Sequence, residues 1–385
     1  MMVCDGWQAA KNILCVRLDS LGDVLLTSPA FAAMKHGRPE SRLTLLTSPS
    51  GAAAGRLIPE IDDIVVYESP WMKPARARGG PSDPDSAPDR QMIERLAAAH
   101  YEAAVIFTVY SQSPLPAALL CHLADIPLRL AHCRENPYHL LSDWVREPEP
   151  DQFVRHEVQR QLDLVATVGA KCDDDRLRLA VPEDARRRLL RRLAELGING
   201  SIPWLVMHPG STAASRRYPP EKFAVAADRL AELDFRVIFT GDRSEHELVE
   251  SIRQRMNSAS YSLCGQLELA ELAALVEAAP VVISNNTAPV HVAAAVGTPV
   301  VDLYALTNPQ HTPWRVPHRV LFRDVPCKYC YKSVCPQGHH DCLRLVEPEQ
   351  VVQATIDLLT KTGRQSGHAS NTSAGTHCWE TSCTP

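Results

Sequence analysis

The chain has 385 residues, of which 45% are hydrophobic and 22% charged, so it is long enough for two domains with separate cores. Its net charge of -5 argues against a nucleic-acid-binding protein, which normally carries a basic excess. No apolar run approaches the ~18 residues of a membrane span, and the first residues lack the basic and apolar regions of a signal peptide, so we expect a cytoplasmic protein.

The first predicted strand and helix enclose a carboxylate. Residues 13–18 (ILCVRL) form a short apolar strand, and the turn 19–23 (DSLGD) leads into a helix over 24–35. Asp23 stands at the helix start, where such a side chain commonly caps the helix. The alternative is catalytic, because a carboxylate at a strand end facing a crevice is placed to take a proton from a bound hydroxyl.

Strands and helices alternate through the rest of the first half, which predicts a parallel α/β sheet. Between 70 and 89 the composition shifts to Pro, Gly, Arg and Asp, typical of a surface loop. Its basic residues face either solvent or an acidic acceptor. They are Lys73, Arg76 and Arg78. The predicted strands are 43–47, 64–67, 103–109 and 127–131, and the predicted helices are 115–124 and 156–168.

A second α/β unit follows a helix over 182–197. The strand 204–208 (WLVMH) ends in 209–219 (PGSTAASRRYP), whose small residues let the backbone wrap an anion while Arg216 adds a forked positive charge. Such turns are also common without a ligand. After the strand 236–240, Glu245 either accepts ribose hydroxyls or occupies the first turn of the next helix, where carboxylates are favoured.

Residues 281–309 read as a strand, a polar turn, a short helix and a second strand. Thr287 suits the N-cap position, and Gly297 suits the residue after the helix. A helix that begins at the carboxyl end of a parallel strand points free N–H groups into the crevice, which suits a phosphate. An ordinary βαβ unit with a polar turn would have the same pattern.

Four cysteines near the end form the pattern C-x2-C-x4-C-x6-C, with two histidines between the last two. Clustered thiolates suit a structural zinc ion or an iron–sulfur cluster, and a disulfide or a clamp of free thiols is the alternative. The other cysteines before residue 300 read as small apolar side chains in a reducing compartment. We expect 363–385 to be a disordered tail. The four clustered residues are Cys327, Cys330, Cys335 and Cys342.

Three motifs together resemble glycosyltransferase family 9, the bacterial heptosyltransferases that extend the lipopolysaccharide inner core. They lie at 17–30 (RLDSLGDVLLTSPA), 208–223 (HPGST followed by RRYPPEKF) and 286–309 (NTAPVH, GTPVV and TNP). The likeness covers about residues 11–359. It implies the GT-B fold: two Rossmann-like domains, expected at 1–175 for the acceptor and 176–345 for the nucleotide sugar. A last helix at 346–362 would return toward the N-terminal domain.

The resemblance also implies roles for individual residues. Asp23 takes the place of the general base, and Arg216 that of a pyrophosphate contact. At the donor, Leu267 falls where an apolar side chain packs on adenine. The family usually has Asp, then Ser or Thr, then Gly at the phosphate loop, where this chain has Asn, Thr and Ala, so the departure concerns the donor sugar. The donor-binding residues are Ser211, Thr212, Glu245, Leu267, Asn286, Thr287, Ala288 and His291.

The leading hypothesis is therefore an inverting glycosyltransferase. It would move heptose from ADP-L-glycero-D-manno-heptose to a lipid-anchored saccharide at the inner face of the cytoplasmic membrane, with no metal needed for the chemistry. The alternatives are a sugar-nucleotide epimerase of the same fold, and a non-catalytic module that binds a nucleotide sugar or a metal. An NAD enzyme is disfavoured, because neither half has a G-x-G-x-x-G turn after its first strand.

Overall fold

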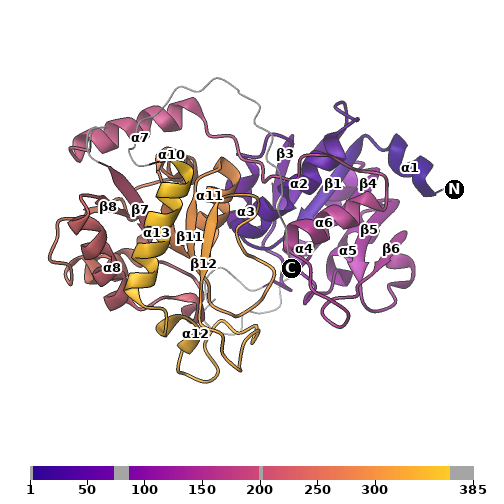
Figure 1. The fold of residues 1–385 in the computed structure, drawn as a ribbon. Coiled ribbons are helices and arrows are strands. Elements are labelled where there is room, and N and C mark those ends of the chain that lie inside the picture. Colours follow the sequence, from indigo (N-terminus) through magenta and orange to yellow (C-terminus); the bar gives the residue numbers. More distant parts are fainter. Residues whose placement is uncertain (1–2, 73–85, 199–202, 365–385) are drawn as a thin grey trace.

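The computed structural model describes residues 3–72, 86–198 and 203–364. Each half of this chain is built around one parallel sheet (Figure 1). Most of the predicted tail lies outside the described residues, and so do the three basic residues of the predicted 70–89 loop. These are Lys73, Arg76 and Arg78.

The first sheet has six parallel strands in the order β3-β2-β1-β4-β5-β6. Its central strands are buried along nearly their whole length, because a parallel sheet is covered by helices on both faces. The strands are β1 (Asn12–Arg17), β2 (Arg42–Thr47), β3 (Asp63–Val66), β4 (Ala103–Ile106), β5 (Leu128–Cys133) and β6 (Asp143–Arg146).

The second sheet repeats this topology in the order β12-β11-β10-β7-β8-β9, again with all neighbours parallel. The predicted parallel α/β class is therefore confirmed. The strands are β7 (Trp204–His208), β8 (Arg236–Phe239), β9 (Tyr261–Ser262), β10 (Val282–Asn285), β11 (Val300–Leu303) and β12 (His318–Leu321).

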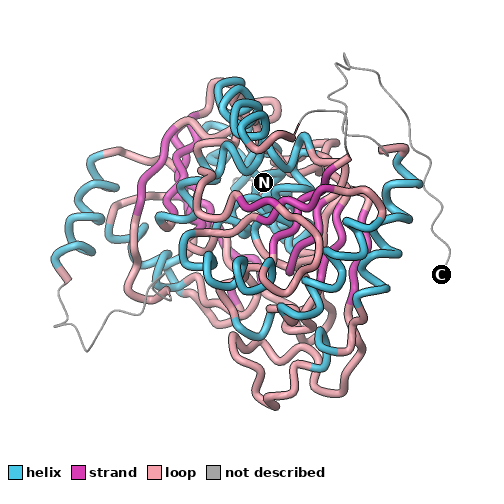
Figure 2. The backbone as a smooth tube through the Cα atoms, turned by 90° about the vertical axis from the view of Figure 1, so that its left-hand side faces the viewer, coloured by secondary structure: helices cyan, strands magenta, loops and turns pink. Residues whose placement is uncertain are grey.

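Helices cover both sheets, and the strands lie between them (Figure 2). Those of the first half are α1 (Val3–Ala9), α2 (Leu21–Lys35), α3 (Pro49–Gly55), α4 (Ala87–Ala98), α5 (Leu115–Leu123) and α6 (Glu157–Ala166). Those of the second half are α7 (Glu183–Glu195), α8 (Pro220–Glu232), α9 (His246–Arg253), α10 (Leu269–Ala278), α11 (Ala288–Val296), α12 (Asp341–Arg344) and α13 (Pro348–Thr362).

Each sheet reverses its strand order once, between β1 and β4 in the first and between β7 and β10 in the second. Ligands of open parallel sheets bind at the carboxyl ends of the strands, next to such a reversal. The turns that follow β1 and β7 and the turn that follows β10 contain the residues singled out from the sequence. The topology therefore places these residues where this fold class binds its ligands.

The two halves meet through α2 and α11, which pack against each other. One cluster of buried apolar side chains runs from the first sheet into the second, with Phe31 of α2 and Val290 of α11 among its members. This contact holds the starts of both helices, and the strand ends that precede them, close together.

The last helix, which we expected to return toward the N-terminal half, makes its main contacts with α8, β11 and β12 of the second half. Val351, Leu358 and Leu359 are buried in the core of the second sheet. The apolar stripe of this helix is therefore used to cover its own sheet.

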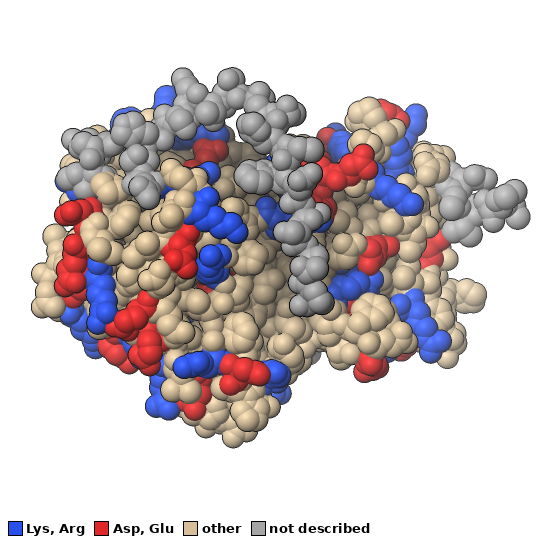
Figure 3. Space-filling view, viewed as in Figure 1, with Lys and Arg blue, Asp and Glu red and all other residues tan. Residues whose placement is uncertain are grey.

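Within the described residues, no helix is long and apolar enough to cross a membrane. On the face seen in Figure 3, basic and acidic side chains are interspersed and form no large patch of one sign.

Candidate active site

Asp23 lies in the first turn of α2, directly after β1. Its Oδ2 accepts hydrogen bonds from the backbone N–H of Ser20 at 3.1 Å and from the hydroxyl of Ser20 at 2.7 Å. Its Oδ1 lies 3.3 Å from the guanidinium of Arg17. Asp23 therefore does cap the helix, and 18% of its side chain stays exposed and available to a substrate.

A buried arginine organises the carboxylates around Asp23. The Arg17 side chain is fully buried; its Nε lies 3.0 Å from Asp19, and its Nη1 lies 3.0 Å from Glu157 of α6. A charge in such a place must be paired, because an unpaired buried ion costs several kcal/mol. Arg17 therefore fixes the turn after β1 in place by forming ion pairs with three carboxylates at once.

The two aspartates of this turn have opposite pKa shifts. Burial raises the pKa of Asp19 to about 6, even though the Arg17 charge lowers it. Burial also acts to raise the pKa of Asp23, but Arg17, His311 and the bonds from Ser20 outweigh it and lower the value to about 2. Asp23 is thus a carboxylate at every physiological pH, whereas Asp19 titrates near neutrality.

Two histidines of the second half reach this turn. A methyl group on Gly22 would lie 2.8 Å from the ring of His291, so this glycine allows α11 to approach the start of α2. Burial lowers the pKa of His291 to about 3, which keeps its ring neutral. Burial also lowers the pKa of His311, which interacts electrostatically with both Asp23 and Arg216. Groups from both halves therefore surround Asp23.

Glu245 packs against the turn after β7. A Cβ atom on Gly210 would lie 2.0 Å from a Glu245 carboxylate oxygen, so any larger residue there would require the Glu245 side chain to move. The other Glu245 oxygen accepts the N–H of Asp242 at 2.9 Å, within a capping box, and lies 3.8 Å from Nε2 of His208. Burial raises the pKa of Glu245. The two loops of the predicted donor site are thus in direct contact, and the interpretation of Glu245 as a residue of the helix start is confirmed.

Arg216 is the last residue of a short 3-10 helix that follows β7, and its side chain reaches the segment after β11. Its Nε donates to the Thr307 hydroxyl at 3.2 Å. Ser211 is buried and accepts a hydrogen bond from Arg217 through its carbonyl oxygen at 2.8 Å, while Thr212 is exposed. The 211–216 segment therefore adds a fixed positive charge to the strand ends of the second sheet.

Asn286 of the predicted phosphate loop bonds to a buried carboxyl group, that of Asp302. Thr287 occupies the N-cap position of α11 and Ala288 its first turn, although the Thr287 hydroxyl makes no capping bond. Both N–H groups of the Asn286 amide are used, one on Asp302 at 2.9 Å and one on the His311 carbonyl at 2.9 Å. The Asn286 carbonyl oxygen therefore turns away from these partners. Burial raises the pKa of Asp302 well above its usual range.

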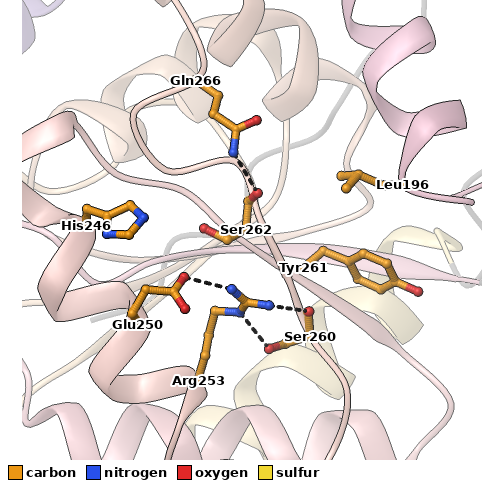
Figure 4. Close-up of a pocket in the computed structure, with 8 residues that line it drawn as sticks. All are labelled: Leu196, His246, Glu250, Arg253, Ser260, Tyr261, Ser262 and Gln266. Atoms are coloured by element: carbon orange, nitrogen blue, oxygen red, sulfur yellow. Dashed lines mark hydrogen bonds and ion pairs between the residues drawn. The ribbon is translucent and has the colours of Figure 1, made fainter.

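Leu267 is half-buried and packs on the main core. Nearby, an open groove of about 430 Å³ runs along the edge of the second sheet at β9 (Figure 4). Arg253 in this groove is held by Glu250 at 2.7 Å and by the carbonyl of Ser260 at 3.0 Å. None of the predicted site residues lines the groove. Its only arginine is already paired, and the groove lies away from the predicted site residues, so the chemistry is not assigned to it.

The cysteine cluster is a set of free thiols in this structure. Two of its members, Cys327 and Cys342, pack on one small apolar cluster, and the Cys327 sulfur lies 3.6 Å from Nε2 of His339. Among the residues that the structure describes, no three His, Cys, Asp or Glu side chains are arranged to hold a metal ion. The predicted zinc or iron–sulfur site at Cys327, Cys330, Cys335 and Cys342 is therefore not supported, and the interpretation as a thiol clamp fits better.

Several residues of the site were missed by the sequence analysis. Arg17 and Asp302 each interrupt an apolar strand (ILCVRL and VVDLY), and a charge inside a buried strand is itself a signal that a partner must exist. Glu157 and His311 gave no such signal, because they meet Asp23 only through the tertiary fold. Asp19 belonged to the predicted turn but was given no role.

Comparison with known proteins gives relatives of one family. The model of the family described as Glycosyltransferase family 9 (heptosyltransferase) matches residues 90–340. Lipopolysaccharide heptosyltransferase 2 of Salmonella typhimurium is 22% identical over 365 residues, which is 91% of this chain and 99% of the relative. Lipopolysaccharide heptosyltransferase 3 of Escherichia coli K12 is 23% identical over 297 residues, which is 76% of this chain and 82% of the relative.

Solved structures show the same fold. A glycosyltransferase family 9 protein from Veillonella parvula has a TM-score of 0.74 at 22% identity, covering 91% of this chain and 97% of that one. The ADP-heptose heptosyltransferase II of E. coli has a TM-score of 0.71 at 20% identity, covering 91% and 99%. The predicted GT-B fold is thereby confirmed. With a family match over 90–340, the chain belongs to glycosyltransferase family 9, the heptosyltransferases, and is a glycosyltransferase enzyme.

Proposed function

We propose that this enzyme moves heptose from an ADP-activated donor onto a lipid-linked saccharide of the lipopolysaccharide core, with inversion at the anomeric carbon. The observation that carries the proposal is the meeting of opposite charges from the two halves. His311 interacts electrostatically with both Asp23 and Arg216, so one buried imidazole connects the carboxylate of the first half with the guanidinium of the second. The names of the relatives, which are lipopolysaccharide heptosyltransferases, support the donor and acceptor class.

The reaction needs a base on one side of the sugar and positive charge on the other. In the proposed step the acceptor oxygen bonds to the anomeric carbon, and the bond from that carbon to the diphosphate breaks. The hydroxyl proton passes to the Asp23 carboxylate, and the bonding electrons leave with the ADP. A single displacement of this kind inverts the anomeric configuration.

Asp23 suits the base role because it is ionised and partly exposed. The leaving diphosphate gains negative charge, and Arg216 together with the free N–H groups at the start of α11 would stabilise it. Ser211, Thr212, Asn286, Thr287 and Ala288 line the donor phosphates in this proposal, with Glu245 at the ribose, Leu267 at the adenine and His291 between the halves.

We propose that each half of the chain binds one of the two substrates. Residues 1–175 would hold the acceptor and residues 176–345 the nucleotide sugar. We also propose that the enzyme works at the inner face of the cytoplasmic membrane, where a lipid-linked acceptor would be reached. Co-sedimentation with vesicles carrying the acceptor lipid, compared with plain vesicles, tests that location.

A transfer assay tests the function. The purified protein is incubated with ADP-heptose and a core acceptor, and UDP- and GDP-sugars serve as donor controls. The mass of the product is measured by mass spectrometry, and its anomeric configuration is determined by NMR. We expect one added heptose of inverted configuration, only with the ADP donor. Conversion of the donor without acceptor would instead indicate an epimerase, and donor binding without any transfer would indicate a non-catalytic module.

A further inference from the structure

Residues 331–333 belong to the loop between β12 and α12, and they lie between the second and third cysteines of the cluster (Figure 1). They hold the backbone next to Arg216. The N–H of Ser215 donates to the Ser333 carbonyl at 3.0 Å, and the Ser215 hydroxyl donates to the Lys332 carbonyl at 2.7 Å. Ser215 is buried, so the loss of these bonds would leave its polar groups unpaired. The segment 331–333 therefore fixes the residue that precedes Arg216.

The same segment also holds the residue that contacts the Arg216 guanidinium. The N–H of Tyr331 donates to the Thr307 carbonyl at 2.8 Å, and the buried Thr307 hydroxyl accepts from Arg216 Nε at 3.2 Å. Among the residues that the structure describes, the two terminal nitrogens of Arg216 have no hydrogen-bond or ion-pair partner. Arg216 is thus held through its backbone and its Nε, while its forked end remains available to an anion.

Two tyrosines of this loop have an uncommon backbone conformation. The φ angle is 60° at Tyr329 and 52° at Tyr331, in the left-handed region that residues other than glycine rarely adopt. Such conformations cost free energy and persist where the surrounding contacts impose them. The contacts here are the bond from the Tyr329 N–H to the Leu306 carbonyl at 2.6 Å and the bond from Tyr331 to Thr307. The path of the loop is therefore determined by the segment that carries the Arg216 contact.

The Tyr331 side chain reaches the first half of the chain. Its hydroxyl contacts the hydroxyl of Tyr110, which follows β4. The two rings pack edge to face, with centroids 6.0 Å apart and an interplanar angle of 76°. Tyr110 is only 4% exposed, so it offers a fixed partner to Tyr331, which is 45% exposed. The segment that holds Arg216 is thus also attached to the opposite half.

From these contacts we propose that residues 331–333 position Arg216 for the departing diphosphate, and that the contact of Tyr331 with Tyr110 makes this positioning depend on how the two halves meet. Ser215, Thr307 and Tyr331 are positioning residues, because they act through Arg216 and touch no reacting atom. The inference rests on the proposed function, in which Arg216 stabilises the leaving group. It gives a part in the reaction to a segment of the cysteine cluster that has no other role.

Two substitutions of Thr307 test the contact with the guanidinium. Thr307→Val keeps the shape of the side chain and removes the hydroxyl, whereas Thr307→Ser keeps the hydroxyl and removes a methyl group. We expect Thr307→Val to lower kcat about tenfold, as for the loss of one hydrogen bond to a charged group, and Thr307→Ser to retain most of it. The acceptor KM should not change. A residue that served only packing would show the reverse order, and that order, or parental kcat in Thr307→Val, would overturn the proposal.

A double-mutant cycle tests whether Thr307 acts through Arg216. In the Arg216→Ala background the hydroxyl has no guanidinium to hold, so adding Thr307→Val should lower kcat no further. A further loss as large as that in the parent background would show that Thr307 acts independently, and would contradict its positioning role.

The link between the halves is tested at the two tyrosines. Tyr110→Phe and Tyr331→Phe should each lower kcat about threefold, and the double variant should lose no more than either single one, because both remove the same contact. Tyr329→Phe is the matched control, since this neighbouring tyrosine has a similar exposure, 42%, and its hydroxyl makes no hydrogen bond among the described residues. It should keep the parental kcat. Parental kcat in both single variants, additive losses, or an equal loss in Tyr329→Phe would refute the link.

ADP binding, measured by calorimetry without acceptor, separates this inference from the proposed function. Thr307→Val should weaken ADP binding in the parent background and leave it unchanged in the Arg216→Ala background. If the parent transfers no heptose but ADP binding follows this pattern, the proposed function fails and the positioning of Arg216 stands. If heptose transfer and ADP binding are both parental in Thr307→Val, the positioning fails and the proposed function stands. Melting temperatures identify any variant that has lost structure, and Tyr331→Phe, which removes one hydroxyl from a half-exposed ring, then decides the question.

Discussion

Replacement of Asp23 by Asn separates the capping role of this residue from its proposed catalytic role. An asparagine oxygen can still accept the two hydrogen bonds from Ser20, so the start of α2 should be preserved. Arg17 keeps two other carboxylates, on Asp19 and Glu157, each at 3.0 Å. The substitution therefore removes the proton acceptor while leaving most of its surroundings intact.

We expect Asp23→Asn to lose the whole rate acceleration that a general base provides. Such a base typically provides about 10² to 10⁴-fold in rate, or about 3 to 5 kcal/mol of barrier at 1.36 kcal/mol per decade. The low pKa of Asp23, about 2, implies that this loss appears at every pH of the assay. Donor affinity should change little, because Asp23 belongs to the opposite half of the site.

Asp19→Asn is the matched control, because Asp19 pairs with the same Arg17 as Asp23 does. The pKa of Asp19, about 6, is closer to neutrality than that of Asp23. Its side chain is less exposed than that of Asp23, at 10% against 18%. We expect this variant to lose less than about tenfold in kcat. The two rates are compared by ADP release with saturating donor and acceptor, and ADP affinity is measured by calorimetry.

The pH profile distinguishes the two carboxylates independently. If Asp23 is the base, kcat/KM shows no acid limb near pH 6, because Asp23 stays ionised down to a pH of about 2. An acid limb near pH 6 in the parent that disappears in Asp19→Asn would assign the base to Asp19. Asp23→Asn with parental kcat would refute the reasoning outright.

Three further predictions follow from the same contacts. Arg216→Ala should lower kcat by about 10² to 10³-fold, with partial recovery in Arg216→Lys, because it removes charge from the leaving diphosphate; equal rates for Ala and parent would exclude this role. Gly210→Ala should raise the donor KM, since its Cβ would lie 2.0 Å from the Glu245 carboxylate; steady-state kinetics with varied ADP-heptose measure this, and an unchanged KM would contradict it. Arg17→Met should lower the free energy of unfolding by about 3 to 5 kcal/mol, because three carboxylates lose their shared cation; urea denaturation at neutral pH measures it, and a loss below about 1 kcal/mol would show that the cluster relaxes.

The sequence alone determined the alternation of helices and central strands, but not the strands β6, β9 and β12 or the helices α1 and α4. Apolar runs such as ILCVRL and WLVMH become buried parallel strands because their side chains are apolar on both faces, a property that is local in the chain. Gly297 ends α11 in the left-handed conformation, with φ of 76°, as its position predicted. By contrast α3 (Pro49–Gly55) was missed, because its seven small residues carry no apolar period.

Only the tertiary structure decided which residues meet. Arg17 and Glu157 are 140 positions apart, and their 3.0 Å contact arises from the packing of α6 beside α2. The Asn286 amide is oriented by Asp302 on the neighbouring strand β11. A cavity near Gln112 and His132 lies between the ends of β4 and β5, which are neighbours in the sheet. Local sequence patterns report backbone conformation and burial, whereas these contacts depend on strand order and on the docking of α2 against α11, which no short segment encodes.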